Sequence, residues 1–198
     1  MNVRPEARMS AEAINALPLV CWQGTIHCVR TAQEAEEAAG RLLRADLLGF
    51  DTETRPAFRK GQHYAPSLLQ LAAEDEVVLV QLERTGLPGP LRELLENPAI
   101  VKAGVAPDFD LKKLQELHPF RPAGFVDLAR MARARGIRHH GLRGLAAVVC
   151  GLRISKSAQT TNWANPELTA RQIRYAATDA WIGREIYLRL YALAPVSA

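Results

Sequence analysis

Residues 47–54, with the sequence LLGFDTET, join an apolar run to two acidic residues, and the rest of the chain is interpreted from this segment. Residues 47–50 are typical of a buried strand, and Asp51 and Glu53 follow at its end. Because successive strand side chains point to opposite faces, Asp51 and Glu53 project to the same side. Like carboxylates at this spacing repel each other unless a cation neutralises them. The segment therefore predicts a strand that ends at a metal site.

The donor type restricts which metal this site would hold. Mg²⁺ and Mn²⁺ prefer carboxylate and water oxygens, whereas zinc calls for His or Cys at characteristic spacing. His139 and His140 are adjacent in a glycine-flanked loop and make a poor zinc pair. A single Asp-x-Glu also occurs by chance on solvated strands, so the metal interpretation depends on acidic residues elsewhere. One of these, Asp179, lies four positions after Tyr175 on a predicted helix, so the two share a face.

Around this strand the chain alternates strand-like and helix-like segments without a linker, a low-complexity tract or an internal repeat. This alternation favours a single α/β domain. Two capping boxes, Thr31 with Glu34 and Thr169 with Gln172, predict helix starts, the second helix running to about Ala192. A further helix is predicted over residues 109–117. Strands are predicted at residues 25–29, 47–52, 67–72, 77–81 and 100–105, and a short strand-like piece begins at Phe125.

Composition sets outer limits on the protein class. The chain has 198 residues and 48% hydrophobic content, which is enough for one buried core. No run approaches the ~18 apolar residues of a membrane span, and the N-terminus has no apolar stretch typical of a signal peptide. We therefore expect a cytoplasmic protein that does not bind membranes. Cys21, Cys28 and Cys150 are odd in number and lack metal-ligand spacing, so they are interpreted as buried thiols.

The charge is unevenly distributed. The formal net charge is +4, and no acidic residue occurs between Asp127 and Glu167. The same interval holds Arg130, Arg133, Arg135, Arg138, Arg143, Arg153 and Lys156. Such a stretch is typical of a protein that binds a phosphate backbone. A solvated basic face is the alternative, and charge alone leaves both open.

Several motifs in order resemble the DEDDy 3′–5′ exonucleases, the group of ribonuclease D, family A polymerase proofreading domains and the Werner syndrome exonuclease domain. The resemblance is carried by GFDTETRPAF (49–58), VKAGVAPDFDLKKL (101–114) and LTARQIRYAATDAW (168–181). ISKSAQTTNW (154–163) and APSLLQLA (65–72) are similar to segments of the ribonuclease D and Werner branch. The similarity implies a ribonuclease H-like fold, a mixed five-stranded sheet flanked by helices in a single domain. It also implies an N-terminal extension over residues 1–21 and an exonuclease domain over residues 22–194.

The resemblance also assigns the site. It implies that Asp51, Glu53, Asp110 and Asp179 hold two divalent ions, Mg²⁺ or Mn²⁺, and that Tyr175 is the tyrosine of the subgroup name. Asp110 matches the second motif better than Asp108, which is then a first-turn helix charge. Two such ions would clamp the scissile phosphate. Asp51 would bridge them, Glu53 and Asp179 would complete the nucleophile side, and Asp110 would act through a water. Tyr175 and Glu53 would orient the attacking water, because a tyrosine with a pKa near 10 stays protonated.

Substrate contacts are predicted at three further positions. Thr54 and Phe109 match positions that contact the terminal nucleotide in relatives, and Lys156 can pair with a phosphate. Phe109 would stack on a base or belong to the core, and Lys156 is alternatively a solvated loop lysine. Trp163 and Asn162 are predicted to anchor their loop, and Asp127 to be structural.

The resemblance implies a metal-dependent exonuclease that removes nucleoside 5′-monophosphates from single-stranded or recessed 3′ ends, with DNA favoured over RNA. A ribonuclease D-like or oligoribonuclease-type exoribonuclease is the alternative, and an inactive nucleic-acid-binding module is a remote one. Ala106 stands where polymerase proofreading domains place an asparagine, which favours the Werner-like branch. Accessory, helicase and polymerase domains are not recognised, so we expect a free-standing nuclease that acts alone, as a homo-oligomer or within a complex.

Overall fold

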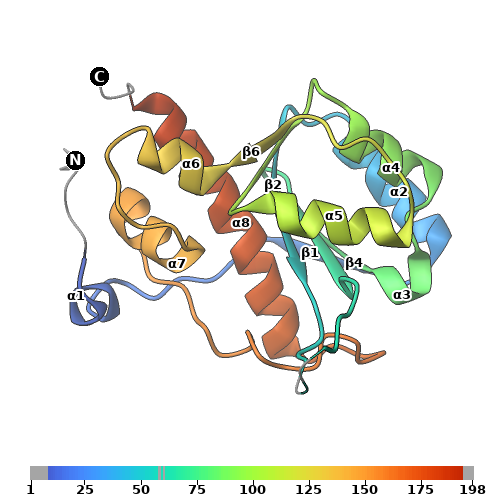
Figure 1. Ribbon diagram of the computed structural model, residues 1–198, viewed down its shortest axis with the longest axis horizontal. Helices are drawn as coiled ribbons and strands as arrows, with labels where there is room; N and C mark the ends of the chain where they lie inside the picture. Colours follow the sequence, from blue (N-terminus) through green and yellow to red (C-terminus); the bar gives the residue numbers. More distant parts are fainter. Residues whose placement is uncertain (1–8, 58, 60, 194–198) are drawn as a thin grey trace.

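The computed structural model describes residues 9–57, 59 and 61–193, and its centre is one mixed sheet. The strands are Thr25–Val29 (β1), Leu47–Glu53 (β2), Leu68–Ala72 (β3), Glu76–Gln81 (β4), Val101–Gly104 (β5) and Phe125–Asp127 (β6). Their order across the sheet is β1-β4-β3-β2-β5-β6. β3 is antiparallel to β2 and β4, and the other neighbours are parallel. The predicted mixed α/β fold in a single domain is confirmed (Figure 1).

The sheet has six strands in the described residues, so the expected number of five is wrong. The additional strand is β6, whose three residues pair with Lys102–Gly104 of β5. β6 is short because the side chain of its last residue, Asp127, accepts a hydrogen bond from Ala129 N and starts the next helix. The strand-like piece at Phe125 is therefore part of the sheet.

Helices cover both faces of the sheet (Figure 1). They are Ala11–Asn15 (α1), Ala32–Leu42 (α2), Leu82–Thr85 (α3), Gly89–Glu96 (α4), Pro107–Leu117 (α5), Leu128–Arg133 (α6), Leu142–Leu145 (α7) and Ala170–Ala192 (α8), with a π-helical turn at Ala146–Cys150 (η1). Both predicted capping boxes are present, at Thr31 and Thr169. α5 begins at Pro107, two residues before the predicted start, because proline suits the first helical position.

The faces of the sheet have different partners. Side chains such as Leu48, Phe50 and Leu69 pack against α2, α4 and α5 in one apolar cluster. The opposite face of the same strands, including Leu68 and Leu79, packs against α8. Residues 50 and 52 therefore point toward the α5 side, and residues 49, 51 and 53 toward α8. No helix in the described part of the chain has the length and apolar character needed to cross a bilayer.

Candidate active site

Asp51 and Glu53 lie on the face of β2 that meets α8. The approach of α8 depends on Gly49, because a Cβ atom at this position would lie 1.9 Å from the Ala180 carbonyl oxygen. Without that methyl group the helix backbone rests directly on the strand. Asp179, next to Ala180 on α8, is thereby held close to Asp51 and Glu53, and the three carboxyls interact electrostatically.

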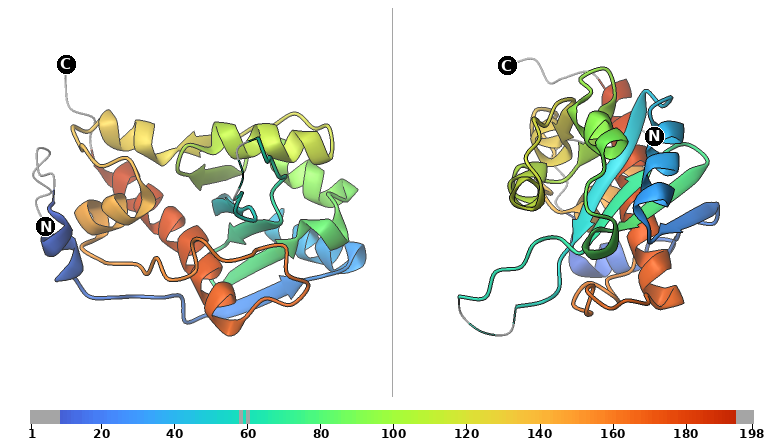
Figure 2. Two further views of the ribbon diagram at one scale, coloured as in Figure 1. Left: turned by 60° about the horizontal axis from the view of Figure 1, so that its bottom comes forward. Right: turned by 90° about the vertical axis from the view of Figure 1, so that its right-hand side faces the viewer.

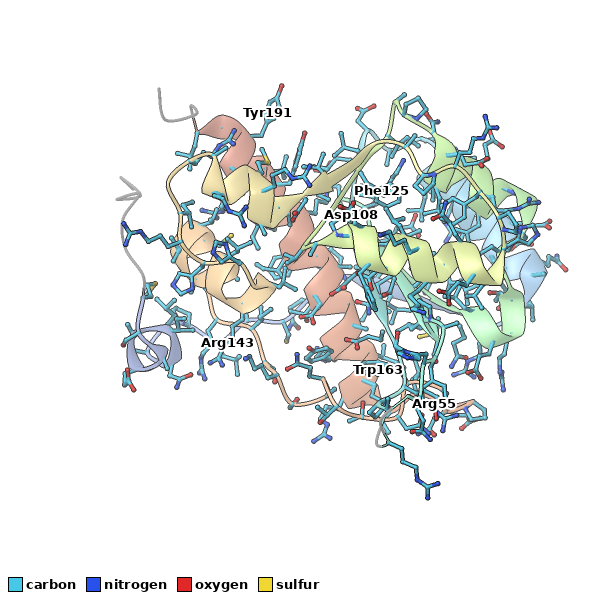
Figure 3. All side chains as sticks on the ribbon, viewed as in Figure 1. Arg55, Asp108, Phe125, Arg143, Trp163 and Tyr191 are labelled. Carbon is cyan, nitrogen blue, oxygen red and sulfur yellow. The ribbon has the colours of Figure 1, made fainter. Side chains whose placement is uncertain are left out.

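Asp110 approaches from the opposite face of β2. It lies in the first turn of α5, and its Oδ1 accepts a hydrogen bond of 2.8 Å from Thr52 Oγ1. The backbone amide of Thr52 donates to Asp51 Oδ1 at 2.8 Å. Thr52 thus links the two acids, a role that the sequence interpretation missed although strand alternation already placed Thr52 opposite Asp51. Asp108 is exposed and lies 4.0 Å from Arg130, outside the cluster (Figure 3).

The turn into α5 has an unusual backbone. Ala106 has a φ of +50°, in the left-handed region that favours glycine or asparagine. Its amide donates to Asp127 Oδ1 at 3.0 Å, and the same oxygen accepts from Ala129 N. Asp127, predicted to be structural, therefore fastens the start of α5 to β6 and α6. This contact fixes the direction in which Asp110 enters the site.

The acidic cluster is electrostatically unfavourable in its ionised form. Burial, with a contribution from the Asp110 carboxylate, raises the pKa of Asp51 to about 7. Burial and then the repulsion of Asp51, Asp179 and Asp110 raise the pKa of Glu53 to about 9. Burial also raises the pKa of Asp110, against the hydrogen bond from Thr52, and raises that of Asp179 well above its ordinary value. The cluster therefore gains stability from added positive charge.

Tyr175 lies one helical turn before Asp179. Its ring packs against the buried Trp163, with 5.9 Å between the ring centroids and a tilt of 42°. Burial and the neighbouring Asp179 and Glu53 carboxylates raise the pKa of the Tyr175 hydroxyl, so it stays protonated at neutral pH and can donate a hydrogen bond. Trp163 has the predicted anchoring position, because only 1% of its surface is exposed.

The donor set is suitable for a divalent cation. The cluster offers carboxylate oxygens, the ligands that hard divalent ions prefer. Asp179 Oδ1 is buried without a hydrogen-bond partner among the described residues, although buried oxygens are normally paired. No three acidic, His or Cys side chains of residues 9–57, 59 and 61–193 already surround one point as a ready coordination cluster. The carboxylate oxygens and the unpaired Asp179 Oδ1 therefore fit a divalent ion.

Asp51, Glu53 and Asp179 line one wall of a cleft of about 1070 Å³, and Asp110 lies behind them, bonded to Thr52. The stretch without acidic residues, 128–166, lies beside the cleft as well. Among its residues that line the cleft are Arg138, His140, Arg143 and Lys156. Other arginines of the stretch have structural contacts: Arg135 Nε donates to the Leu193 carbonyl, and Arg153 Nε to the Leu17 carbonyl. The predicted basic surface is thus divided, and one part of it faces the carboxylates.

The N-terminal segment forms another wall, which the sequence interpretation missed. Met9, Ser10, Ala11 and Ile14 line the cleft. Met9 N donates to His139 Nε2 at 3.0 Å, and the Arg143 guanidinium donates to Asn15 Oδ1. The segment carries no motif, and only the fold brings it to residues about 130 positions away.

The remaining predicted substrate residues differ in position. Phe109 is 68% exposed, so it is not the core residue that one alternative described. Lys156 is exposed and lines the cleft. Thr54 is half-buried directly after Glu53. Asn162 bonds within its own loop, to Asn165 and to the Ala164 amide, in agreement with an anchoring role.

Comparison with known sequences identifies the family. A family model described as 3′–5′ exonuclease matches residues 26–193. The chain belongs to the DEDDy-type 3′–5′ exonuclease family. Members of this exonuclease family depend on divalent metal ions.

Relatives of this chain include much longer proteins. The mouse bifunctional 3′–5′ exonuclease/ATP-dependent helicase WRN is 34% identical over 184 residues, which are 88% of this chain and 13% of that protein. Ribonuclease D of Gluconacetobacter diazotrophicus is 32% identical over 163 residues, 80% of this chain and 40% of that protein. The chain thus spans less than half the length of each.

Solved structures show the same fold. The Nibbler EXO domain of Aedes aegypti superimposes with a TM-score of 0.75 at 23% identity, over 93% of this chain and 90% of that domain. Trypanosoma brucei RNase D in complex with RNA U12 gives a TM-score of 0.74 at 20% identity, over 92% and 65% of the respective chains.

Proposed function

We propose that this protein is a metal-dependent 3′–5′ exonuclease that hydrolyses the terminal phosphodiester of nucleic acid and releases nucleoside 5′-monophosphates. The observation that supports this function best is that Asp51, Glu53, Asp110 and Asp179, from three separate elements, form one interacting acidic cluster beside the cleft. Their raised pKa values and the unpaired oxygen of Asp179 are what a site for divalent cations requires.

Asp51, Glu53, Asp110 and Asp179 would hold two divalent ions, Mg²⁺ or Mn²⁺. Bound there, such ions neutralise the charge of the scissile phosphate and lower the pKa of the attacking water. The chain itself places the acids: Gly49 sets the approach of α8 to β2, and Thr52 orients Asp110. Because the acids enclose no common point yet, their side chains would rotate inward when the ions bind.

Other residues would bind and orient the reactants. The protonated hydroxyl of Tyr175 would donate a hydrogen bond to the attacking water or its phosphate and hold it in line with the departing oxygen. Arg138, Arg143 and Lys156 would contact phosphates of the strand in the cleft. The exposed ring of Phe109 would stack on the terminal base.

DNA is the proposed main substrate, presented as a single strand or a recessed 3′ end. DNA polymerase I of Aquifex aeolicus, 30% identical over 155 residues, supports this choice. Ribonuclease activity is the second candidate, because the 32% identical relative is named ribonuclease D. The two differ in whether the cleft accepts a 2′-hydroxyl.

The test is digestion of 5′-labelled DNA and RNA of the same sequence, with Mg²⁺, with Mn²⁺ and with chelator. We expect a ladder shortened from the 3′ end and no hydrolysis in chelator. Asp110→Asn should lower activity on the order of 10³-fold because one metal-site carboxylate is lost. Asp108→Asn, two residues away and exposed, is the matched control and should retain wild-type activity. Full activity of Asp110→Asn would refute the site, and a preference for RNA would select the second candidate.

A further inference from the structure

A loop between β2 and β3 projects from the body of the protein. We call residues 54–66 the arm, and the argument below uses only its described residues 54–57, 59 and 61–66. In the right-hand view of Figure 2 the arm stands out on the side where α5 and α6 lie and extends beyond both helices. Its two ends are joined at the base, where Ser67 N donates to the Glu53 carbonyl at 2.8 Å. The arm therefore starts directly at one of the carboxylates of the site.

Contacts between its two limbs give the arm a defined shape. The Arg55 guanidinium lies 4.3 Å from the centroid of the Tyr64 ring and so bridges the limbs. Near the tip, Gln62 N donates to the Arg59 carbonyl at 3.1 Å, and Arg59 N donates to Gln62 Oε1. Gly61 supplies the φ of +88° that closes this turn. The tip consequently presents the exposed Arg59 and His63 to solvent.

The arm contains basic residues and no acidic residue of its own. The sequence contains no acidic residue between Glu53 and Glu74. Among the described residues, neither Arg55 nor Arg59 forms an ion pair with a carboxylate. Projecting, unpaired guanidinium groups of this kind are suited to phosphate oxygens.

The position of the arm separates it from the cleft. Arg138, Arg143 and Lys156 line the cleft, whereas none of the described arm residues, 54–57, 59 and 61–66, does. In Figure 3 Arg143 and Arg55 lie on opposite sides of α8. A strand held in the cleft by the first group would therefore leave the arm free to contact phosphates outside it.

We propose that the arm binds the phosphate backbone of the complementary strand when the 3′ end in the cleft is recessed in a duplex. This proposal rests on the proposed exonuclease function. The five Cα–Cα steps from Thr54 to Arg59 reach at most ~18 Å, more than the ~12 Å width of a duplex major groove. The arm is thus long enough to start beside the reacting strand and place Arg59 on the opposite strand.

The test compares Arg59→Ala with wild type on one 5′-labelled DNA strand, single-stranded or annealed so that its 3′ end is recessed. On the duplex, KM should rise about tenfold because a charge-assisted phosphate contact is lost. On the single strand, kcat and KM should change less than about twofold. The slope of log affinity against log salt should fall by about 0.9 for the duplex only. Equal loss on both substrates, or no loss on either, would overturn the proposal.

Two controls isolate the charge of the arm. Arg59→Lys retains the positive charge and should keep most of the duplex affinity. Arg44→Ala removes an exposed arginine that follows α2 and is not part of the arm, and it should behave as wild type. Binding measured by fluorescence anisotropy in chelator with the Asp110→Asn variant does not depend on hydrolysis. If wild type cleaved no nucleic acid, the proposed function would fail, and this binding comparison would still decide whether the arm selects duplex.

Discussion

Two carboxylates of the cluster are oriented by one neighbouring residue, whereas burial is the main cause of the raised pKa of all four. Thr52 donates to Asp110, and the Thr52 amide donates to Asp51, so a single residue orients acids on both faces of β2. Tyr175 is held by its packing against Trp163. The orientation of a carboxylate and its pKa therefore depend on different contacts, and a substitution can change one without the other.

Tyr175→Phe should lower kcat about 10- to 100-fold and leave KM and thermal stability unchanged. The ring remains packed on Trp163, and only the hydroxyl that would orient the attacking water is lost. Steady-state kinetics on labelled DNA measures kcat and KM. A thermal unfolding curve for each variant measures its stability. Trp163→Phe is the companion, because it keeps the hydroxyl and loosens its support. A Tyr175→Phe variant with full kcat would show that the hydroxyl has no part in the reaction.

Ala106→Asn should raise the free energy of unfolding by about 0.5–1 kcal/mol. Asparagine tolerates a left-handed φ better than alanine, and the Ala106 amide would keep its bond to Asp127. Urea denaturation measures the change. Ala106→Val, which tolerates this φ worse, should act in the opposite direction. A loss of stability in Ala106→Asn would mean that the asparagine side chain meets an obstacle at the start of α5.

The sequence predicted those elements whose first or last residue is determined by contacts between residues that are close in the chain. The capping boxes at Thr31 and Thr169 define α2 and α8 through contacts within four residues. The alternation in residues 47–53 correctly placed Asp51 and Glu53 on one face. β6 was harder, because its three residues become a strand only by pairing with β5. The role of Thr52 was missed because its hydroxyl points to the opposite face of β2. Its hydrogen bond to Asp110 can be recognised only when α5 is known to pack there.

Lys102 connects β5 to the end of α4, and its buried ammonium group makes the free energy of unfolding depend on pH. It is fully buried on β5, and its ammonium donates to the Leu94 and Asn97 carbonyls at the end of α4. Burial lowers its pKa from 10.5 to about 8. Between about pH 8 and pH 10.5 the unfolded chain holds a proton that the folded protein has released. The contribution of Lys102 to the free energy of unfolding therefore rises with pH across this window and is constant below it.

The difference in unfolding free energy between wild type and Lys102→Met should thus grow by about 1–3 kcal/mol from pH 7.5 to pH 10. Urea denaturation followed by circular dichroism at several pH values measures it, and other titrating groups cancel in the difference. Lys112→Met, on the exposed surface of α5, is the control and should show no such trend. Parallel curves for wild type and Lys102→Met would mean that the ammonium is solvated in the folded protein.

The cleft as a whole is assembled from the two ends and the middle of the chain. The carboxylates were predicted because the family motifs surround them, and the acid-free stretch pointed to the cationic wall. The wall built from Met9, Ser10, Ala11 and Ile14 was not predictable, because its contacts to His139 and Arg143 are tertiary. Residues that only line a cavity leave no periodic or spaced pattern in a sequence.

Deleting residues 1–16 should raise KM for a single-stranded oligonucleotide about three- to tenfold with kcat changed less than about twofold. The deletion removes α1 and one wall of the cleft, whereas the pairing of Val20 with Arg153 remains. Steady-state kinetics measures the effect, and a thermal unfolding curve verifies that the shortened chain folds. Asn15→Ala, which removes only the partner of Arg143, should give a smaller change in the same direction. An unchanged KM would show that the substrate does not touch this wall.

Gly49 makes the spacing between Asp179 and the acids of β2 depend on a missing methyl group. The Ala180 carbonyl would lie 1.9 Å from any Cβ atom at this position, so every other residue would push α8 outward. Asp179 would move with the helix while Asp51 stayed on its strand. Glycine at position 49 therefore sets the distance between α8 and β2, and no residue with a Cβ atom allows the same close approach. Random mutagenesis scored for folded but inactive protein should find this glycine, although it lies outside the cleft and carries no reactive group.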